Sequence, residues 1–191
     1  MKRILVGITG ASGSIYGIRL IEELLKKNIY THILCTENGK KVIEYETALN
    51  INKWISELKE IYPHVKLEDI HNLFSGVASG SYSLDAVVIL PCSMGTLAEI
   101  SCGLSKNLLT RAADVALKEN RKLIVCPRET PLNTIHLENM LKLSKLGATI
   151  LPPMPGFYHR PSSLENLVNF VVGKILDYLS IDNQLFNKWE D

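Results

Sequence analysis

The stretch from Lys2 to Leu25 constrains the fold more than any other part of this chain. It begins with a nearly continuous apolar run up to Ile8, which is typical of a strand buried on both faces of a parallel sheet. Glycines then recur at every third position, and after them apolar residues return at helical spacing. The pattern predicts a strand, a tight turn and a helix that packs back onto the sheet, with Ser14 as the helix cap.

The turn itself, GITGASG, predicts an anion-binding site. Closely approaching backbone amides and a helix N-terminus both attract negative charge. The G-x-x-G-x-x-G spacing differs from the dinucleotide fingerprint, and the lysine of a P-loop is missing, so glycine for turn geometry alone is the alternative. Ser12 adds a hydroxyl at the apex, which favours a phosphate site, whereas Glu37 matches a ribose-binding acid only weakly.

Length and composition indicate one soluble domain. The 191 residues suffice for a single substantial core, which we expect over residues 1–180, with a C-terminal tail at 181–191 available for a subunit interface. The net charge of +1 argues against nucleic acid as a partner, and no apolar run is long enough to span a membrane. The N-terminus does not resemble a secretory signal, and the cysteines lack C-x-x-C spacing. We therefore expect a cytoplasmic protein with reduced, mostly buried thiols at Cys35, Cys92 and Cys126.

Apolar runs and amphipathic segments alternate along the rest of the chain. Further strands are predicted at 32–35, 86–90, 123–125 and 149–151, with Pro91 and Pro127 ending two of them. Further helices are predicted at 40–47, 52–61, after Cys92, at 107–119, at 132–146, and from Ser162, where Glu165 completes a capping box. This alternation predicts a three-layer α/β fold of the flavodoxin or Rossmann type, with a doubly wound, mostly parallel sheet.

Small, hydroxyl or charged residues directly follow several predicted strands, in the segments GITGASG, CTEN, PCSMGT and CPRETPL. In doubly wound sheets, ligands bind beyond the carboxyl ends of the strands. Arg128 and Glu129 follow a buried strand, where they need each other or solvent as partners, and the planar guanidinium of Arg128 suits a phosphate. The sequence therefore predicts one site built from several loops.

Taken in order, GITGASG, SGSY, PCSMGTL, LLTRAADV, PRETPL and GFYHRP resemble the UbiX-type flavin prenyltransferase family. The resemblance runs from Lys2 to about Leu179, and PCSMGTL together with RETPL is its most specific part. It implies a fold that binds reduced FMN and dimethylallyl phosphate and joins the prenyl unit to N5 and C6 of the flavin, without a metal. It also implies a homo-oligomer, typically a dodecamer, and a partner decarboxylase that uses prenylated FMN as its cofactor.

The resemblance assigns residues to three roles. Those expected to contact FMN are Gly10, Ala11, Ser12, Thr36, Ser93, Met94, Gly95, Thr96 and Arg128. Those expected to line the reaction site are Ser12, Glu46, Lys118 and Glu129, with Glu129 or the leaving phosphate as acceptor of the C6 proton. Tyr158 and Lys174 are expected to bind the prenyl phosphate. Lys174 stands where family members carry arginine, so it keeps the charge but loses the two-pronged fork.

Two other functions remain open from the sequence. An FMN-dependent cysteine decarboxylase would share the fold and the FMN site, but PMPGFYHRP lacks the Pro-x-Met-Asn type of motif associated with those enzymes. A non-catalytic FMN carrier or regulatory subunit would need only the FMN loops. The joint presence of the reaction-site residues and Tyr158 argues against a carrier, so the sequence predicts a flavin prenyltransferase.

Overall fold

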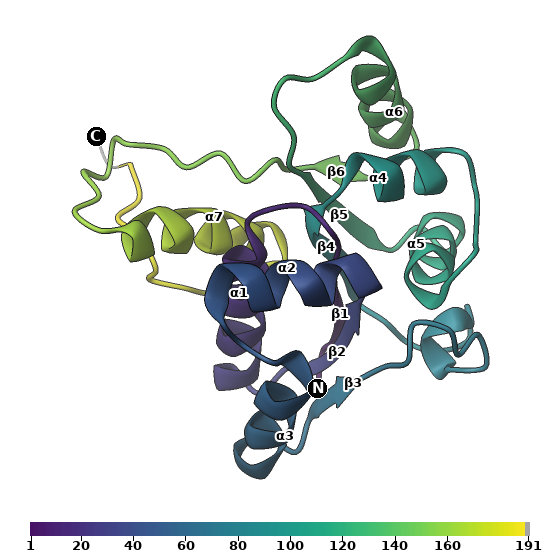
Figure 1. The fold of residues 1–191 in the computed structure, drawn as a ribbon, viewed down its shortest axis with the longest axis horizontal. Coiled ribbons are helices and arrows are strands. Elements are labelled where there is room, and N and C mark those ends of the chain that lie inside the picture. Colours follow the sequence, from purple (N-terminus) through teal and green to yellow (C-terminus); the bar gives the residue numbers. More distant parts are fainter. Residues whose placement is uncertain (190–191) are drawn as a thin grey trace.

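The computed structural model describes residues 1–189, and at its centre lies a six-stranded sheet in which neighbouring strands are all parallel (Figure 1). The strand order is β3-β2-β1-β4-β5-β6. The strands are β1 (Arg3–Ile8), β2 (Tyr30–Cys35), β3 (Val65–Leu67), β4 (Ala86–Cys92), β5 (Lys122–Pro127) and β6 (Thr149–Ile150). The predicted doubly wound α/β fold is confirmed, with a sheet that is wholly rather than mostly parallel.

Helices cover both faces of this sheet, because side chains along each central strand alternate between two apolar cores (Figure 1). On β1, for example, Val6 belongs to one core and Leu5 to the other. The first core is completed by α1 (Ser14–Lys26), α2 (Glu37–Thr47), α3 (Ile51–Ile61) and α7 (Leu164–Tyr178). The second is completed by α4 (Met94–Ser101), α5 (Leu108–Lys118), α6 (Thr134–Lys145) and the segment around the 3-10 helix η1 (Gly76–Ala78).

The strand order reverses direction between β1 and β4. From β1 the chain builds β2 and β3 on one side, and then crosses back to place β4, β5 and β6 on the other. The loop after β1 leads to α1 on one face, and the loop after β4 leads to α4 on the other. In such folds this point of reversal, at the carboxyl edge of the sheet, is the crevice that binds ligands.

Of the two prolines predicted to end strands, Pro127 does so and Pro91 does not. β5 ends at Pro127, whereas β4 continues through Pro91 to Cys92. The pairing of β4 with β5 shifts register between Ile89 and Cys92, which accommodates a residue that has no N–H to donate to the ladder.

Two helix caps also differ from the prediction. α1 is capped by Gly13 in the left-handed conformation, with φ of 101°, and Ser14 is already its first helical residue. At α7 the cap is Ser163, whose hydroxyl accepts a hydrogen bond from the Asn166 amide at 3.2 Å. The expected capping box of Ser162 and Glu165 is therefore wrong by one residue.

The described part of the C-terminal tail folds back on its own chain. The Asn183 side-chain amide donates to the Gly173 carbonyl at 3.2 Å and to the Asp177 carboxylate at 2.9 Å. Phe186 packs onto α7 beside Phe170, with ring centroids 5.0 Å apart. Over residues 181–189 the tail thus contacts α7, and the remainder of the predicted tail segment, 190–191, lies outside the described residues.

The cysteines are unpaired, and Cys35, Cys92 and Cys126 are buried as predicted, while Cys102 is exposed. Burial raises the pKa of the Cys35 thiol to about 12, and it raises the pKa values of the Cys92 and Cys126 thiols as well. These three side chains therefore behave as small apolar groups. Among the described helices, none combines the length and apolarity that a bilayer crossing requires.

Candidate functional site at the carboxyl edge of the sheet

The loops predicted to form the site follow β1, β2, β4 and β5, which are neighbours in the sheet. Arg128 links three of these loops. Its Nε donates to the Ser12 carbonyl oxygen at 3.0 Å, and its backbone amide donates to the Cys92 carbonyl oxygen at 3.1 Å. Segments that are far apart in the sequence are therefore hydrogen-bonded into one surface.

The N-terminus of α4 opens onto this surface. Ser93 caps the helix by accepting a hydrogen bond from the Thr96 amide at 3.3 Å, and its hydroxyl donates to Thr96 Oγ1 at 3.1 Å. Gly95 has open space on its side-chain side, since no heavy atom outside its own helical turn lies within 4 Å of the position that a Cβ would take. Met94 is buried beneath the same turn. The first turn of α4 can therefore receive an anion, because helix amides and the helix dipole both favour one there.

The N-terminus of α1 is occupied instead by the side chain of Glu46, from α2. Its Oε2 accepts hydrogen bonds from the Ser14 amide at 2.9 Å and the Ser14 hydroxyl at 2.7 Å, and both carboxylate oxygens lie 3.1 Å from the Gly13 amide. Burial raises the pKa of Glu46, but hydrogen bonds from the Ser12 and Ser14 hydroxyls and from the two amides lower it by more. The pKa of Glu46 therefore lies below its usual range, and an ionised carboxylate occupies the position predicted for a phosphate.

The loop after β1 packs closely against the start of α2. A Cβ on Gly10 would lie 2.7 Å from the Cβ of Asn38, so only glycine fits without a shift. Ala11 is buried beside it. Thr36 caps α2 by accepting a hydrogen bond from the Gly39 amide at 3.0 Å, which starts the helix at Glu37, earlier than predicted. Gly10, Ala11 and Thr36, which the resemblance assigns to FMN, thus lie close together at the carboxyl edge of the sheet.

Glu129 is exposed, and its Oε1 accepts a hydrogen bond from the Thr130 amide at 3.0 Å. It forms no ion pair with Arg128 among the described residues. Of the two alternatives for this pair of charges, solvation is therefore the one that the structure shows.

Tyr158 lies in an aromatic cluster beside the C-terminal tail. Its ring meets those of Phe170 and Trp189 edge to face, with centroids 5.6 and 5.5 Å apart. A cavity of about 440 Å³ adjoins it, lined by Tyr158, His159, Arg160, Asn187, Lys188 and Trp189. Lys174 is exposed on α7. Within one chain, no hydrogen bond or ring contact among the described residues joins Tyr158 or Lys174 to the loops after β1, β4 and β5.

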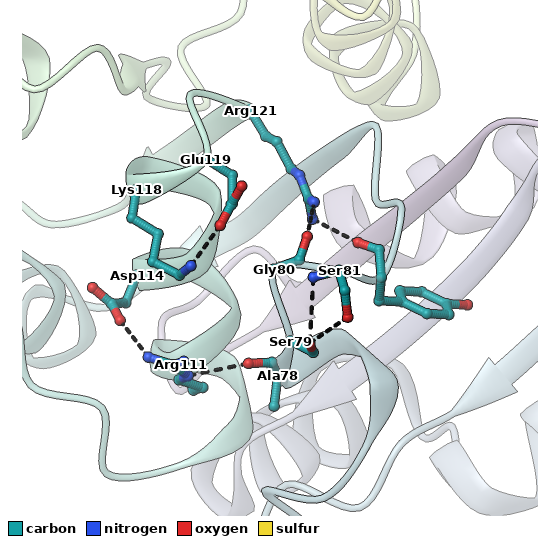
Figure 2. A network of polar contacts seen from close by, with 10 residues as sticks. Ala78, Ser79, Gly80, Ser81, Arg111, Asp114, Lys118, Glu119 and Arg121 are labelled. Atoms are coloured by element: carbon teal, nitrogen blue, oxygen red, sulfur yellow. Dashed lines mark hydrogen bonds and ion pairs between the residues drawn. The ribbon is translucent and has the colours of Figure 1, made fainter.

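Lys118 lies at the other edge of the sheet. It ends α5, just before β5 begins, whereas the crevice is at the carboxyl ends of the strands. Figure 2 shows Lys118 directed at Glu119, with Nζ and Oε1 2.5 Å apart, close to the SGSY loop, where Arg121 donates to the carbonyl oxygens of Tyr82, at 2.7 Å, and Gly80. Arg111, on the same helix, pairs with Asp114 at 2.7 Å. A single chain therefore does not bring Lys118 together with Ser12, Glu46 or Glu129.

Thr9 is a residue of this site that the sequence analysis missed. It is fully buried, and its hydroxyl donates to the Pro91 carbonyl oxygen at 2.9 Å and accepts from the Ser93 amide at 2.7 Å. The signal in the sequence is a hydroxyl residue between a buried strand and a glycine turn, in a chain whose other central strand carries a proline at its end.

The doubly wound sheet, the loops gathered at the reversal of strand order and the anion-receptive terminus of α4 are typical of nucleotide-binding α/β proteins. Comparison with known proteins identifies the family within this class. The model of the Flavoprotein family matches residues 1–176. The flavin prenyltransferase UbiX of Alkalihalophilus pseudofirmus is 50% identical over 98% of this chain and 96% of its own length. That of Methanocaldococcus jannaschii is 49% identical over 98% of both chains.

Solved structures of UbiX-type proteins also match this chain over nearly its whole length. AnUbiX (PadA1), solved in complex with FMN and dimethylallyl pyrophosphate, matches with a TM-score of 0.92 and 38% identity over 100% of this chain and 98% of its own. A dodecameric FMN-dependent Ubix-like decarboxylase from Escherichia coli O157:H7 matches with a TM-score of 0.91 and 37% identity, covering 99% of this chain and 100% of its own. This chain belongs to the UbiX flavin prenyltransferase family.

The cysteine decarboxylase alternative receives less support. The FMN-dependent cysteine decarboxylase TvaF matches with a TM-score of 0.60 and 16% identity over 78% of this chain and 89% of its own, which shows a shared fold alone.

Proposed function

We propose that this chain is a flavin prenyltransferase that joins the dimethylallyl group of dimethylallyl phosphate to N5 and C6 of reduced FMN. The observation that carries the proposal is the full-length identity of about half to curated flavin prenyltransferases. The product, prenylated FMN, then serves a partner decarboxylase as cofactor.

The residues present at the carboxyl edge fit FMN. The open first turn of α4, at Ser93, Gly95 and Thr96, suits the phosphate of FMN, since the matching position at α1 already holds the Glu46 carboxylate. Arg128 lies between the two loops with its Nε fixed to the Ser12 carbonyl, which leaves the rest of the guanidinium available to a bound group. Gly10 lets the loop after β1 pack closely against Asn38 at the start of α2, which holds this side of the site together.

Reduced FMN supplies the nucleophilic N5 and C6 atoms, and the chain supplies positioning, charge and a base. An allyl phosphate ionises readily when its leaving phosphate is neutralised, a role that we assign to Lys118, Arg128, Lys174 and the Tyr158 hydroxyl. Ser12 and Glu46 lie at the apex of the loop after β1, and we place Ser12 nearest to N5. The exposed Glu129 carboxylate accepts the proton lost at C6, with the leaving phosphate as the alternative base.

The separation of Lys118 and Tyr158 from the crevice supports a homo-oligomer, in which neighbouring chains complete each site. We propose a dodecamer, as in the Ubix-like structure from Escherichia coli O157:H7. We also propose that residues 1–180 form the FMN-binding domain, that the tail at 181–191 adjoins a neighbouring subunit, and that the protein works in the cytoplasm, where its free thiols stay reduced.

The proposal is tested by incubating the protein anaerobically with reduced FMN and dimethylallyl phosphate and measuring the mass of the flavin. Addition of one prenyl unit supports the proposal, and addition of the product to an apo-decarboxylase that depends on prenylated FMN should restore its activity. A flavin that binds and is recovered unchanged indicates a carrier. Decarboxylation of a cysteine-terminated peptide by the oxidised flavoprotein indicates the cysteine decarboxylase alternative.

A further inference from the structure

Thr9 lies at the point where the strand order reverses, between the end of β1 and the glycine turn. It is 0% exposed, although it is polar. Its hydroxyl donates to the Pro91 carbonyl at 2.9 Å and accepts from the Ser93 amide at 2.7 Å, while its own backbone amide donates to Pro91 at 3.2 Å. One buried side chain therefore ties the loops after β1 and β4 together.

The backbone ladder cannot make this connection alone. The registered pairing of β1 with β4 ends at Gly7 and Ile89, and two residues further Pro91 has no N–H to donate. Beyond this point β4 also shifts register against β5. The Thr9 hydroxyl supplies the acceptor that the Ser93 amide would otherwise lack inside the protein, and an unpaired buried amide is costly.

The hydrogen bond from Ser93 to Thr9 bears directly on the proposed phosphate position. Ser93 is the cap of α4, and its hydroxyl accepts from the Thr96 amide, so the direction of the first turn of α4 depends on how the Ser93 backbone is held. We propose that Thr9 is a positioning residue for FMN, which acts through Ser93 on the helix terminus that binds the FMN phosphate. This inference rests on the proposed function, and its test distinguishes the two.

The variant Thr9→Val keeps the shape of the side chain and removes the hydroxyl. We expect FMN binding to weaken about threefold to tenfold, the range that the loss of one hydrogen bond gives. Binding of riboflavin, which lacks the phosphate, should weaken less, so the ratio of FMN to riboflavin affinity should fall. Thr9→Ser retains the hydroxyl and should restore the wild-type ratio.

Thr31→Val provides a matched control. Thr31 is also 0% exposed, but it lies near the start of β2, and its hydroxyl donates to the Ile29 carbonyl at 3.0 Å. Both valine variants should lower the melting temperature of the flavin-free protein, and only Thr9→Val should change the affinity ratio. If Thr9→Val does not fold, Thr9→Cys, whose thiol is a weak hydrogen-bonding group, allows the same comparison.

The outcomes separate the two proposals. Wild-type protein that binds neither flavin overturns the assignment of the FMN site. Wild-type protein that binds FMN, together with a folded Thr9→Val that has an unchanged affinity ratio, overturns the role of Thr9 and leaves the FMN site standing. Equal weakening of FMN and riboflavin in Thr9→Val and Thr31→Val would show that the Thr9 hydroxyl acts on general stability alone.

Discussion

Glu46 shows how a single side chain changes the use of a motif. The turn GITGASG predicts an anion at the N-terminus of α1, and an anion is present there, but the protein supplies it from α2. The sequence shows the attraction of the turn for negative charge, because that depends on local backbone geometry. The sequence does not show that Glu46 is the anion, because Glu46 and Ser14 meet only through the packing of α2 on α1.

This arrangement predicts a stability effect for Glu46→Gln. The pKa of Glu46 is lowered in the folded state, so its contribution is present above the unfolded pKa and is lost as pH falls through the folded pKa. At pH 7 the substitution should cost about 0.5–1 kcal/mol, the usual value of an anion at an exposed helix terminus. Urea unfolding at pH 7 and pH 3 measures the cost, with the exposed Glu44→Gln on the same helix as control. Equal destabilisation of Glu46→Gln at both pH values would contradict a charge effect.

Glu129→Gln tests the proposed base. The side chain is exposed, and among the described residues it accepts a hydrogen bond from the Thr130 amide alone, so the substitution should leave the fold and FMN affinity unchanged. Removal of a general base typically costs about 10²- to 10⁴-fold in rate. Single-turnover formation of prenylated FMN should fall by that factor, whereas Glu138→Gln, on the exposed side of α6, should react normally. A wild-type rate in Glu129→Gln would leave the leaving phosphate as the proton acceptor.

At the scale of elements, local patterns predicted the strands and helices, and long-range contacts decided their ends. The apolar runs of β1, β4 and β5 are visible in the sequence because burial on both faces requires them. The continuation of β4 through Pro91 is not visible, because it depends on Thr9, which is distant in the sequence. The cap of α1 differs from the predicted Ser14 because Gly13 adopts the left-handed conformation at that position. The Ser14 hydroxyl instead donates to the Glu46 carboxylate.

The segment that follows β3 is held to the sheet by a buried polar network that the sequence analysis did not anticipate. His32 Nδ1 lies 2.8 Å from Glu68 Oε1, and the Ser75 hydroxyl donates to Glu68 Oε2 at 3.0 Å. The Tyr82 hydroxyl lies 2.9 Å from His32 Nε2, and Lys66 pairs with Glu68 at 2.9 Å. Through Tyr82 this network also anchors the SGSY loop near Lys118.

Glu68→Gln should therefore destabilise the protein strongly. Burial raises the pKa of Glu68, but hydrogen bonds from His32, Lys66 and Ser75 lower it by more, to about 2. A lowered pKa means that the stabilisation is present above the unfolded pKa of about 4.3 and is lost as pH falls toward 2. The cost at pH 7 should be about 3 kcal/mol in urea unfolding, and it should shrink below pH 4. Glu57→Gln, which removes an exposed pair with Lys53 at 3.9 Å, should change little. A cost for Glu68→Gln that is independent of pH would contradict the assignment to ionised Glu68.

At the scale of the whole molecule, the sequence predicted which loops lie at the carboxyl edge better than it predicted where individual side chains lie. The loops after β1, β4 and β5 meet because parallel topology places their ends at one edge, which follows from the alternation of strands and helices. Lys118 lies at the opposite edge, because α5 runs back across the sheet before β5 begins. The family resemblance assigns Lys118 to the reaction site, and contacts within one chain do not bring it there.

The last prediction follows from that separation. If Lys118 acts in the site of a neighbouring subunit, each site takes Lys118 from one subunit and Glu129 from another. Lys118→Ala and Glu129→Gln then remove groups that different subunits contribute to the same site. Each variant alone should be nearly inactive, but co-expression with two affinity tags should yield mixed oligomers with roughly a quarter of wild-type activity, because random assembly leaves that share of sites intact. Mixing the separately assembled variants without subunit exchange provides the control. Light scattering should show a large oligomer in every sample. A monomeric mass, or mixed oligomers as inactive as the single variants, would contradict a site shared between subunits.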